Sequence, residues 1–362
     1  MELPPNCFSS EYTDARSRFL DAAHAAGASV ETFAATHLAE PVWTDAAWLG
    51  RSDATNVLVM VSGTHGQEAF AGSAVQIAWM AQRVILPDHV GVLLVHAINP
   101  YGFKFLTRTT ENNVDLNRNF IDFASHRPAL HPAFKDLHAA MRITAPTQES
   151  FEAVHAALDA LKRTYGAALV GDLLAAGQYV APDGLYYGGR QAEWSRRTLE
   201  AIARQFLQAR SKVAIIDWHV GLGEYAKPFF LCFNEAGTAL RARACEWWGE
   251  ERVSTGTEGF DTGQVPKYQG LLVDGIGDLV APAQSIRTVI EFGTYSNREM
   301  TEALAVDRWL RFEASPGDPR CERARGLMMD RFYPADAAWR AGVLSSGLTI
   351  AGQALSGLEG WH

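Results

Sequence analysis

Short apolar runs that end in polar residues restrict the fold of this chain more than any other feature of its sequence. Two early runs are Asn56–Gly63 (NVLVMVSG), rich in β-branched side chains, and Gly91–Pro100 (GVLLVHAINP). Three later runs begin at Lys212 (KVAIIDWHV), Pro228 (PFFLCFN) and Ser285 (SIRTVIEFG). Runs of this length without polar alternation are typical of strands that are buried on both faces of a sheet.

Segments with helical spacing separate several of these runs. Their ranges are Tyr12–Gly27, Ala69–Val84, Thr238–Arg252 and Asn297–Phe312. Because strands that alternate with helices pack in layers, the sequence predicts an α/β fold. The segment up to Arg51 is interpreted as a lead-in to this core, with no obvious chemistry of its own.

A single domain is the favoured organisation of the 362 residues, because the chain has no low-complexity linker and no internal repeat. Within residues 1–362, the range 125–210 is polar and mostly helical, and we expect it to form a helical insertion or lid. A separate helical subdomain over about the same residues is the alternative.

Composition and charge narrow the possible partners. The formal net charge of -9 and the lack of a polybasic run argue against nucleic acid and anionic membrane surfaces. No apolar stretch reaches the roughly 20 residues of a membrane span, and the N-terminus carries no signal-peptide pattern, so we expect a cytoplasmic protein. The 4 cysteines form no C-x-x-C pair and are expected to be reduced.

Polar residues at the ends of the apolar runs form a candidate metal site. In open α/β sheets, ligands bind outside the carboxyl ends of the strands. The first run leads to His65 and Glu68, a later one ends at His219, and the last contains Glu291. Two imidazoles and a carboxylate are a ligand set of catalytic zinc. We therefore predict one zinc ion per chain on His65, Glu68 and His219, with Glu291 as the general base that activates a water.

The position of these residues, rather than their spacing, supports the prediction. A second H-x-x-E, His37 to Glu40, lies in a polar stretch with no strand before it. Taken singly, each site histidine is interpreted as structural and each glutamate as a helix-end or solvent-facing charge. Four such coincidences together are less probable than one metal site, so the set of four residues favours the metal site. Asp217, two residues before His219 on the same strand face, is expected to orient a ligand; a buried carboxylate without a catalytic part is the alternative.

A second polar cluster, TRTTENNVDLNRNF, spans Thr107–Phe120. An arginine presents a planar fork of donors that matches a carboxylate, and an arginine near a metal can stabilise an oxyanion. The cluster is therefore a candidate clamp for the substrate. A polar surface loop with Asx turns is the alternative.

The order of the motifs resembles that of the zinc carboxypeptidase superfamily. H-G-Q-E, I-N-P-Y-G, R-T-T-E-N-N-V-D-L-N-R-N-F, D-W-H and I-E-F-G-T follow one another between about residues 55 and 300. D-x-H and the glutamate followed by x-G are also similar to the succinylglutamate desuccinylase and aspartoacylase branch. PDGLYYGG, together with these motifs, resembles an uncharacterised carboxypeptidase-like branch. The resemblance implies a three-layer α/β/α sandwich with a mixed, mostly parallel sheet of the phosphorylase/hydrolase-like type.

The resemblance also implies roles for single residues. It implies zinc ligands at His65, Glu68 and His219 and a general base at Glu291, as predicted from the strand ends. It implies that Asn117 and Arg118 bind the substrate's terminal carboxylate and that Arg108 polarises the scissile carbonyl. Tyr268, in GQVPKYQG, is the candidate for the family's mobile tyrosine.

The sequence also departs from the family pattern. Arg118 and His219 are 101 residues apart, farther than in a typical carboxypeptidase, and an insertion over the cleft would favour small substrates. In PDGLYYGG, Tyr186 and Tyr187 are candidate cleft walls, with a structural turn as the alternative.

The leading hypothesis is a zinc hydrolase that cleaves an amide bond next to a free carboxylate. Its substrate is either the end of a short peptide or an N-acyl amino acid, and the motifs do not separate the two. A non-catalytic protein that binds a carboxylate or peptide on the same fold is the alternative. Dinucleotide, P-loop and serine-hydrolase enzymes are disfavoured, since G-x-G-x-x-G after the early strands, G-x-x-x-x-G-K-[ST] and G-x-S-x-G are absent.

Overall fold

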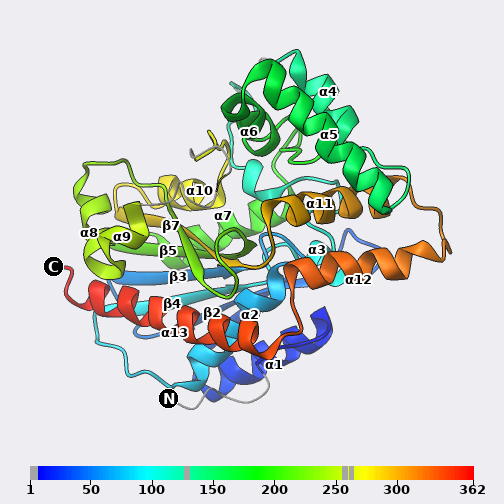
Figure 1. Cartoon of the computed structure of the whole chain (residues 1–362). Coiled ribbons are helices and arrows are strands. Elements are labelled where there is room, and N and C mark those ends of the chain that lie inside the picture. The colour runs from blue at the N-terminus through cyan, green and yellow to red at the C-terminus, as the bar shows by residue number, and fades with distance from the viewer. Residues whose placement is uncertain (1–6, 126–130, 255–259, 261–264) are drawn as a thin grey trace.

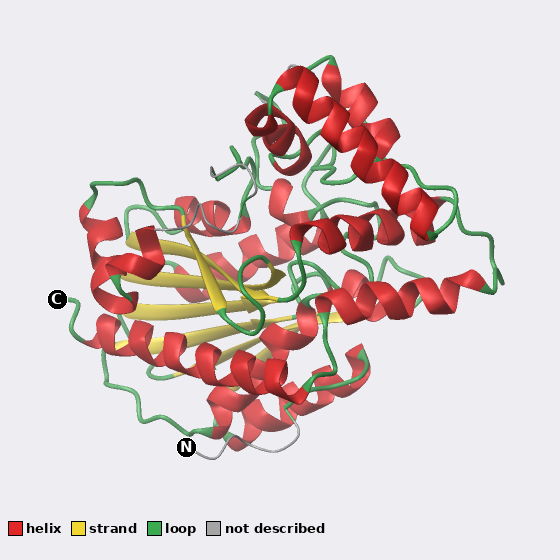
Figure 2. Cartoon of the chain, in the orientation of Figure 1, coloured by secondary structure: helices red, strands yellow, loops and turns green. Residues whose placement is uncertain are grey.

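One mixed β-sheet forms the centre of the molecule (Figures 1 and 2). The computed structural model describes residues 7–125, 131–254, 260 and 265–362. Within these residues, 7 strands pair in the order β1-β2-β4-β3-β5-β7-β6. The strands are β1 (Ser29–Ala34), β2 (Trp43–Leu49), β3 (Asn56–Ser62), β4 (Val90–His96), β5 (Lys212–Gly221), β6 (Pro228–Cys232) and β7 (Gln284–Gly293).

The four adjacent strands β4, β3, β5 and β7 are parallel, so their carboxyl ends lie at one edge of the sheet. β2 is antiparallel to β4, β1 is antiparallel to β2, and β6 is antiparallel to β7. The sheet is therefore mixed, with most strands running in one direction, as the sequence predicts. Every residue of β3 and of β4 is buried, which confirms strands covered on both faces.

Helices cover both faces of the sheet (Figure 2). The helices are α1 (Tyr12–Ala25), α2 (Ala69–Ala81), α3 (Pro100–Phe105), α4 (Ala133–Ala140), α5 (Gln148–Tyr165), α6 (Ala167–Ala175), α7 (Trp194–Leu207), α8 (Ala239–Trp248), α9 (Glu250–Ser254), α10 (Leu272–Leu279), α11 (Asn297–Phe312), α12 (Arg320–Phe332) and α13 (Ala337–Glu359), with a 3-10 turn η1 (Leu116–Arg118). Most predicted helices are present within a few residues of their expected ends. The stretch predicted as one helix over Thr238–Arg252 is divided at Gly249, whose φ of 95° breaks the helical backbone.

Alternate side chains of the strands enter two separate cores, because successive residues of a strand point to opposite faces. On one face Leu58 and Met60 of β3 pack with α1, α2, α8 and α13. On the other face Val57 and Val59 pack with α7 and α10. The molecule is thus a three-layer α/β/α sandwich, in agreement with the predicted fold class.

A third apolar cluster lies beyond the sheet. It joins α4 and α5 to α11 and α12 through side chains such as Phe151, Leu158, Met300 and Met328. Figure 1 shows α4, α5 and α6 grouped together above α11, away from the sheet. Of the predicted insertion over 125–210, residues 126–130 lie outside the described part, and α7 packs against the sheet. The division into one domain with an insertion stays a prediction.

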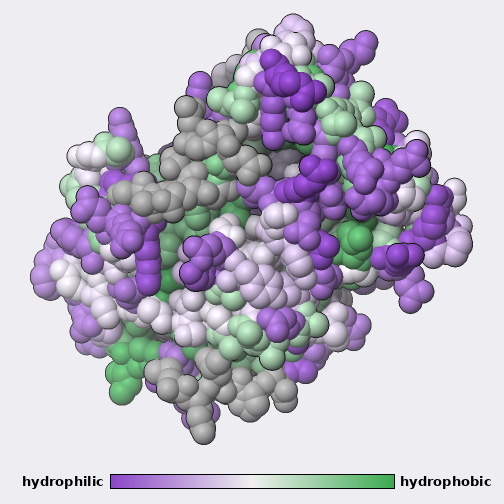
Figure 3. Space-filling view, in the orientation of Figure 1, coloured by the Kyte–Doolittle hydropathy of each residue, from purple (hydrophilic) through white to green (hydrophobic). Residues whose placement is uncertain are grey.

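The described helices contain no candidate membrane span. Across the described residues, every helix is too short or too polar to cross a bilayer. Figure 3 shows one face of the molecule, on which hydrophilic residues surround small hydrophobic areas.

Candidate metal centre and catalytic cavity

His65 and Glu68 lie in the short connection between β3 and α2, where the apolar run ends. Glu68 is the N-cap residue of α2, and His65 is three residues earlier. The connection is held against the start of α3, since a Cβ on Gly66 would lie 1.8 Å from the carbonyl carbon of Gly102. The glycines of H-G-Q-E and I-N-P-Y-G therefore touch, and this contact leaves no room for a side chain on Gly66.

His219 and Glu291 come from neighbouring parallel strands. His219 on β5 and Glu291 on β7 are direct partners in the strand register, near the carboxyl ends of both strands. Because β3 also pairs in parallel with β5, its carboxyl end reaches the same edge of the sheet. The four residues predicted from strand ends are thus brought to one place.

His65, Glu68 and His219 form a compact group of possible metal ligands. One ligand atom from each lies within 4.8 Å of the others, and all three residues are buried. Nδ1 of His65 is 3.1 Å from Oε1 of Glu68, and Nδ1 of His219 is 3.2 Å from Oε2 of the same carboxylate. The centroids of the two imidazole rings are 4.7 Å apart. Both Nδ1 atoms therefore face the carboxylate.

The opposite ring nitrogens are held by two further carboxylates. Nε2 of His65 lies 3.0 Å from Oδ1 of Asp115, and Nε2 of His219 lies 2.8 Å from Oδ2 of Asp217. Asp217 in turn accepts a hydrogen bond of 2.7 Å from the hydroxyl of Thr64. Carboxylates on the far nitrogens fix the orientation of metal-binding imidazoles. Asp217 is placed as the sequence predicts, whereas Asp115 is not among the predicted residues.

The charges of the group suit a divalent cation. Burial alone would raise the pKa of Glu68. The imidazoles of His65 and His219, which face this carboxylate, outweigh burial and lower the pKa of Glu68 well below its usual value. Burial would lower the pKa of His219, yet Asp217 and Glu68 raise it well above the ordinary range. Nδ1 of His65 makes no hydrogen bond within the described residues. A cation among the three would take the place of protons on the imidazoles and bind this nitrogen, which already faces the Glu68 carboxylate.

Arg108 lies directly beside the ligand group. Its Nη1 donates to Oε1 of Glu68 and its Nε donates to Oδ2 of Asp115, both at 3.0 Å. Burial opposes its charge, but these two carboxylates outweigh burial and raise the pKa of Arg108, so the guanidinium stays charged. Two of its five N–H donors are used in these bonds, so Arg108 keeps others for a ligand.

Glu291 stands next to the three ligands without being one of them. Burial raises its pKa to about 7, although the nearby charge of His219 acts in the opposite direction. Its Oε2 accepts a long hydrogen bond of 3.4 Å from the backbone N–H of Leu222. A carboxyl group with a pKa near neutrality can both take up and release a proton, as a general base requires.

Asn117, Arg118 and Tyr268 face the same cavity as the ligand group. Oδ1 of Asn117 accepts a hydrogen bond from the backbone N–H of Leu272, which leaves its amide N–H groups without a partner in the described residues. Arg118 donates from Nε and Nη2 to the carbonyl of Ala175 and from Nη1 to that of Asn117. The centre of its guanidinium lies 4.8 Å from the ring of Tyr268.

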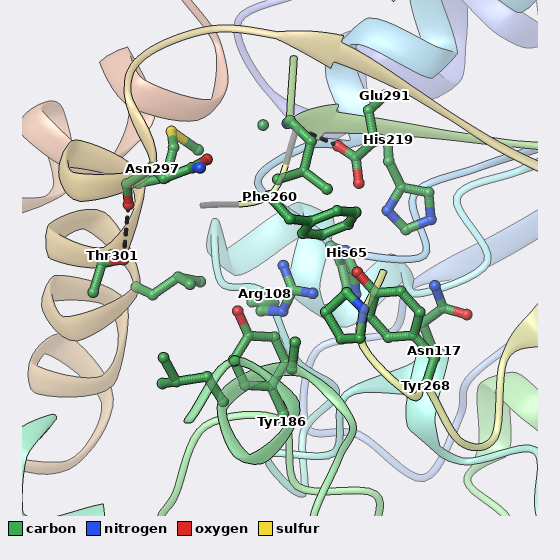
Figure 4. Close-up of a pocket in the computed structure, with 18 of the residues that line it drawn as sticks. His65, Arg108, Asn117, Tyr186, His219, Phe260, Tyr268, Glu291, Asn297 and Thr301 are labelled. Carbon is green, nitrogen blue, oxygen red and sulfur yellow. Dashed lines mark hydrogen bonds between the residues drawn. The ribbon is translucent and has the colours of Figure 1, made fainter. Parts of the chain in front are cut away.

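The cavity has a volume of about 420 Å³, and the three residues of the ligand group line it. Figure 4 shows His219 and Glu291 on one side, Asn297 and Thr301 of α11 on the other, and Arg108 with Tyr186 between them. Tyr186 lines the cavity, whereas Tyr187 does not, so only one of the two predicted wall tyrosines is in place. An apolar wall that the sequence analysis missed lies near Glu291 and consists of Leu222, Leu231, Phe233, Phe260, Leu271 and Val289.

Comparison with known proteins gives a family match over most of the chain. A family model described as "Protein of unknown function (DUF2817)" matches residues 8–346. A search of curated proteins returned no match.

Comparison of the structure with solved structures returned carboxypeptidases and proteins described as metallopeptidases. Thrombin activatable fibrinolysis inhibitor matches at 12% identity over 96% of this chain and 74% of its own, with a TM-score of 0.48. Carboxypeptidase A from Helicoverpa armigera matches at 11% identity over 88% and 73%, with a TM-score of 0.46. A candidate metallopeptidase from Shewanella amazonensis matches at 12% identity over 89% and 93%, with a TM-score of 0.40.

Proposed function

The chain belongs to the family described as "Protein of unknown function (DUF2817)", and we propose that it is a zinc-dependent hydrolase that cleaves an amide bond next to a free carboxylate. One observation carries the proposal. A buried group of two histidines and a glutamate lies beside a carboxyl group with a raised pKa, in a cavity that also presents the guanidinium of Arg118.

The ligand group matches the donor set of zinc better than that of a hard cation. Two imidazole nitrogens and one carboxylate are typical of catalytic zinc, whereas calcium and magnesium take oxygen ligands. His65, Glu68 and His219 would hold one ion per chain. Zinc, when bound, polarises a carbonyl oxygen and lowers the pKa of water toward about 7.

Glu291 is proposed as the general base. Its pKa of about 7 leaves a substantial fraction of the carboxylate form at neutral pH, so it can take the proton of an attacking water. The same carboxyl group then returns the proton to the leaving amine. Arg108, which stays charged between Glu68 and Asp115, provides positive charge beside the scissile carbonyl as its oxygen gains negative charge.

Arg118 and Asn117 are proposed to bind the free carboxylate of the substrate. Three of the five N–H groups of Arg118 are used by backbone carbonyls, which leaves one on each terminal nitrogen. Two such donors match a carboxylate in a bidentate arrangement. The amide N–H groups of Asn117, without a partner among the described residues, lie in the same cavity, and the ring of Tyr268 packs against the guanidinium of Arg118.

The apolar wall beside Glu291 suggests the side chain of the preferred substrate. Val289 precedes Glu291 by two residues on β7 and pairs with Leu231 of β6, so both contribute to that wall. A substrate residue that binds Arg118 through its carboxylate would place its side chain there. We therefore propose an apolar residue next to the carboxylate, in a small molecule or short peptide.

The proposed compartment is the cytoplasm.

Turnover and metal content together test this function. Zinc-loaded protein is incubated with matched dipeptides and N-acetyl amino acids that carry phenylalanine, leucine, lysine or glutamate next to the carboxylate, and release of the free amine is measured. We expect activity on the phenylalanine and leucine compounds. Elemental analysis should find one zinc per chain, lost in His65→Ala and His219→Ala but kept in the surface control His24→Ala. Absence of turnover on both panels at full zinc occupancy contradicts the hydrolase.

A Glu291→Gln variant separates a hydrolase from a binding protein with the same fold. If Glu291 is the base, the variant keeps its zinc and loses about 10² to 10⁴-fold in kcat. Normal hydrolysis by the variant removes Glu291 from the mechanism. Tight binding of the N-acetyl amino acids without hydrolysis by the wild type would support the alternative, a non-catalytic carboxylate-binding protein.

A further inference from the structure

Tyr186 lies against both arginines of the cavity. The centre of its ring is 5.1 Å from the guanidinium carbon of Arg108 and 5.6 Å from that of Arg118. A guanidinium within about 6 Å of an aromatic ring is attracted by the negative charge of the ring face. Figure 4 shows the ring beside Arg108, with the hydroxyl directed into the cavity. One aromatic side chain thus contacts the group beside the metal ligands and the group proposed to bind the carboxylate.

The backbone of Tyr186 is in an unusual conformation. Its φ of 53° lies in the left-handed region, which bulky side chains seldom adopt. Such a conformation persists only where the surrounding structure holds it, and it is concentrated at functional sites. A glycine or asparagine would adopt it more readily, so the tyrosine side chain itself is the feature that needs an explanation.

Hydrogen bonds on both sides hold this residue in place. The backbone N–H of Gln178 donates to the carbonyl of Tyr186 at 3.0 Å, and the N–H of Asp115 donates to that of Tyr187 at 2.7 Å. The amide of Asn113 donates to the carbonyl of Gly184 at 3.2 Å. Asp115 also holds His65, so Asp115 links the loop that carries Tyr186 to the proposed metal-ligand group.

We propose that Tyr186 is a positioning residue whose ring fixes the guanidinium groups of Arg108 and Arg118 relative to each other. The two arginines are proposed to act on different parts of one substrate, so their separation sets the distance between the scissile carbonyl and the carboxylate. Tyr186 therefore makes the site selective for the length of the link between the amide nitrogen and the carboxylate of the substrate. The inference rests on the proposed function, because it assigns both arginines to the same substrate.

The contact is made by the ring rather than by the hydroxyl. Within the described residues, no group forms a hydrogen bond with the Tyr186 hydroxyl, whereas two cations contact the ring. Phenylalanine keeps these contacts, and leucine removes them while retaining an apolar side chain. Tyr187, buried but outside the cavity, provides a matched control.

The experiment compares N-acetyl-phenylalanine with its β-amino acid homologue, which has one more methylene between nitrogen and carboxylate. The ratio of kcat/KM for the two compounds is measured for wild type, Tyr186→Phe, Tyr186→Leu and Tyr187→Phe. We expect the wild type to prefer the α compound. Tyr186→Leu should raise KM and lower the ratio by about tenfold each, while both phenylalanine variants stay near the wild type. Melting temperature and zinc content confirm that each variant is folded and loaded.

Several outcomes would overturn the proposal. An unchanged ratio in Tyr186→Leu shows that the ring does not set the distance, and an equal loss in Tyr186→Phe assigns the effect to the hydroxyl. Calorimetric binding of the same two compounds separates this inference from the hydrolase itself. A wild type that binds the α compound more tightly without hydrolysing it contradicts the hydrolase. In that case the ratio of the dissociation constants of the two compounds is compared among wild type and variants instead of the kcat/KM ratio. A wild type that binds neither compound contradicts both proposals.

Discussion

Glu68 and Glu291 face the same cavity, yet their surroundings give the two carboxyl groups opposite protonation behaviour. Two imidazoles face Glu68 and lower its pKa, whereas burial dominates at Glu291 and raises its pKa to about 7. In active sites, two carboxyl groups with different pKa values usually have different chemical roles. Here the ionised group is suited to hold a cation and the other to exchange a proton.

The pKa of Glu291 predicts how activity depends on pH. A base acts in its unprotonated form, so kcat/KM should fall as pH decreases through the pKa of Glu291. A bound cation lowers that pKa by electrostatic attraction, and the midpoint should therefore lie at or below about 7. A pH profile of kcat/KM for wild type and Glu291→Gln checks this. The acidic decrease should vanish in the variant, and an unchanged profile assigns it to another group.

Asp115 and Asp217 should control the affinity for zinc without binding it. Each holds the far nitrogen of one ligand imidazole. Asn in either position keeps the shape of the side chain but weakens the acceptor, so zinc affinity should fall about 10 to 100-fold. Competition with a chromogenic chelator measures the dissociation constants. Asp45→Asn is the control, since Asp45 is also buried and ion-paired but contacts Arg16 rather than a ligand histidine. Equal affinities in all variants would exclude the orienting role.

The grouping of the three proposed metal ligands was predictable because each follows or ends a run of strongly apolar residues, and parallel strands must end at one edge. Asp115 had no comparable signal. It lies in a polar loop that also contains Glu111, and only the fold brings Asp115 to His65. Tyr186 and Tyr187 are adjacent in sequence, so the pattern alone could not tell which one faces the cavity.

At the scale of elements, the buried central strands and β6 were predictable, and the side of the sheet formed by β1 and β2 was not. β1 and β2 fall in the segment that was interpreted as a lead-in, because polar side chains interrupt both strands. Asp45 of β2 is fully buried, where it accepts hydrogen bonds from Arg16 of α1 and Thr32 of β1. Partners distant in sequence make this burial favourable, and local composition does not reveal them.

The end of α6 helps to position Arg118, which is proposed to bind the substrate carboxylate, because the carbonyl of Ala175 accepts hydrogen bonds from one side of its guanidinium. Gly177 follows with a φ of 106°, and a Cβ there would lie 2.7 Å from Cδ of Arg118. Gly177→Ala should therefore displace Arg118 and raise KM about tenfold, with a smaller effect on kcat. Steady-state kinetics on the preferred substrate measure both constants.

Gly166 offers a control in the same helical segment. It has a φ of 90°, and a Cβ there would meet no atom within 4 Å. Gly166→Ala thus introduces similar backbone strain without contact to Arg118, and its KM should match that of the wild type. Equal KM values in the two variants would show that Arg118 tolerates the added methyl group, and that Gly177 does not set the position of Arg118.

For the whole molecule, the metal centre joins segments that are distant in the chain. His65 follows β3, His219 lies on β5, and both strands pair along their length in the middle of the sheet. An unfolded chain cannot hold the three proposed ligands together, so the proposed zinc ion would bind the folded state and stabilise it. At a zinc concentration 100 times the dissociation constant, the free energy of unfolding should rise by about 2.7 kcal/mol.

For a chain of 362 residues, this stabilisation corresponds to a rise in melting temperature of roughly 3 °C. Differential scanning calorimetry of the wild type with excess chelator and with zinc measures the shift. In His65→Ala the chelator and zinc traces should coincide, because the variant lacks a ligand. Glu291→Gln should retain the full shift, since Glu291 is proposed to move a proton rather than to bind the ion. If zinc stabilises wild type and His65→Ala equally, the ion binds elsewhere and the three buried side chains are not its ligands.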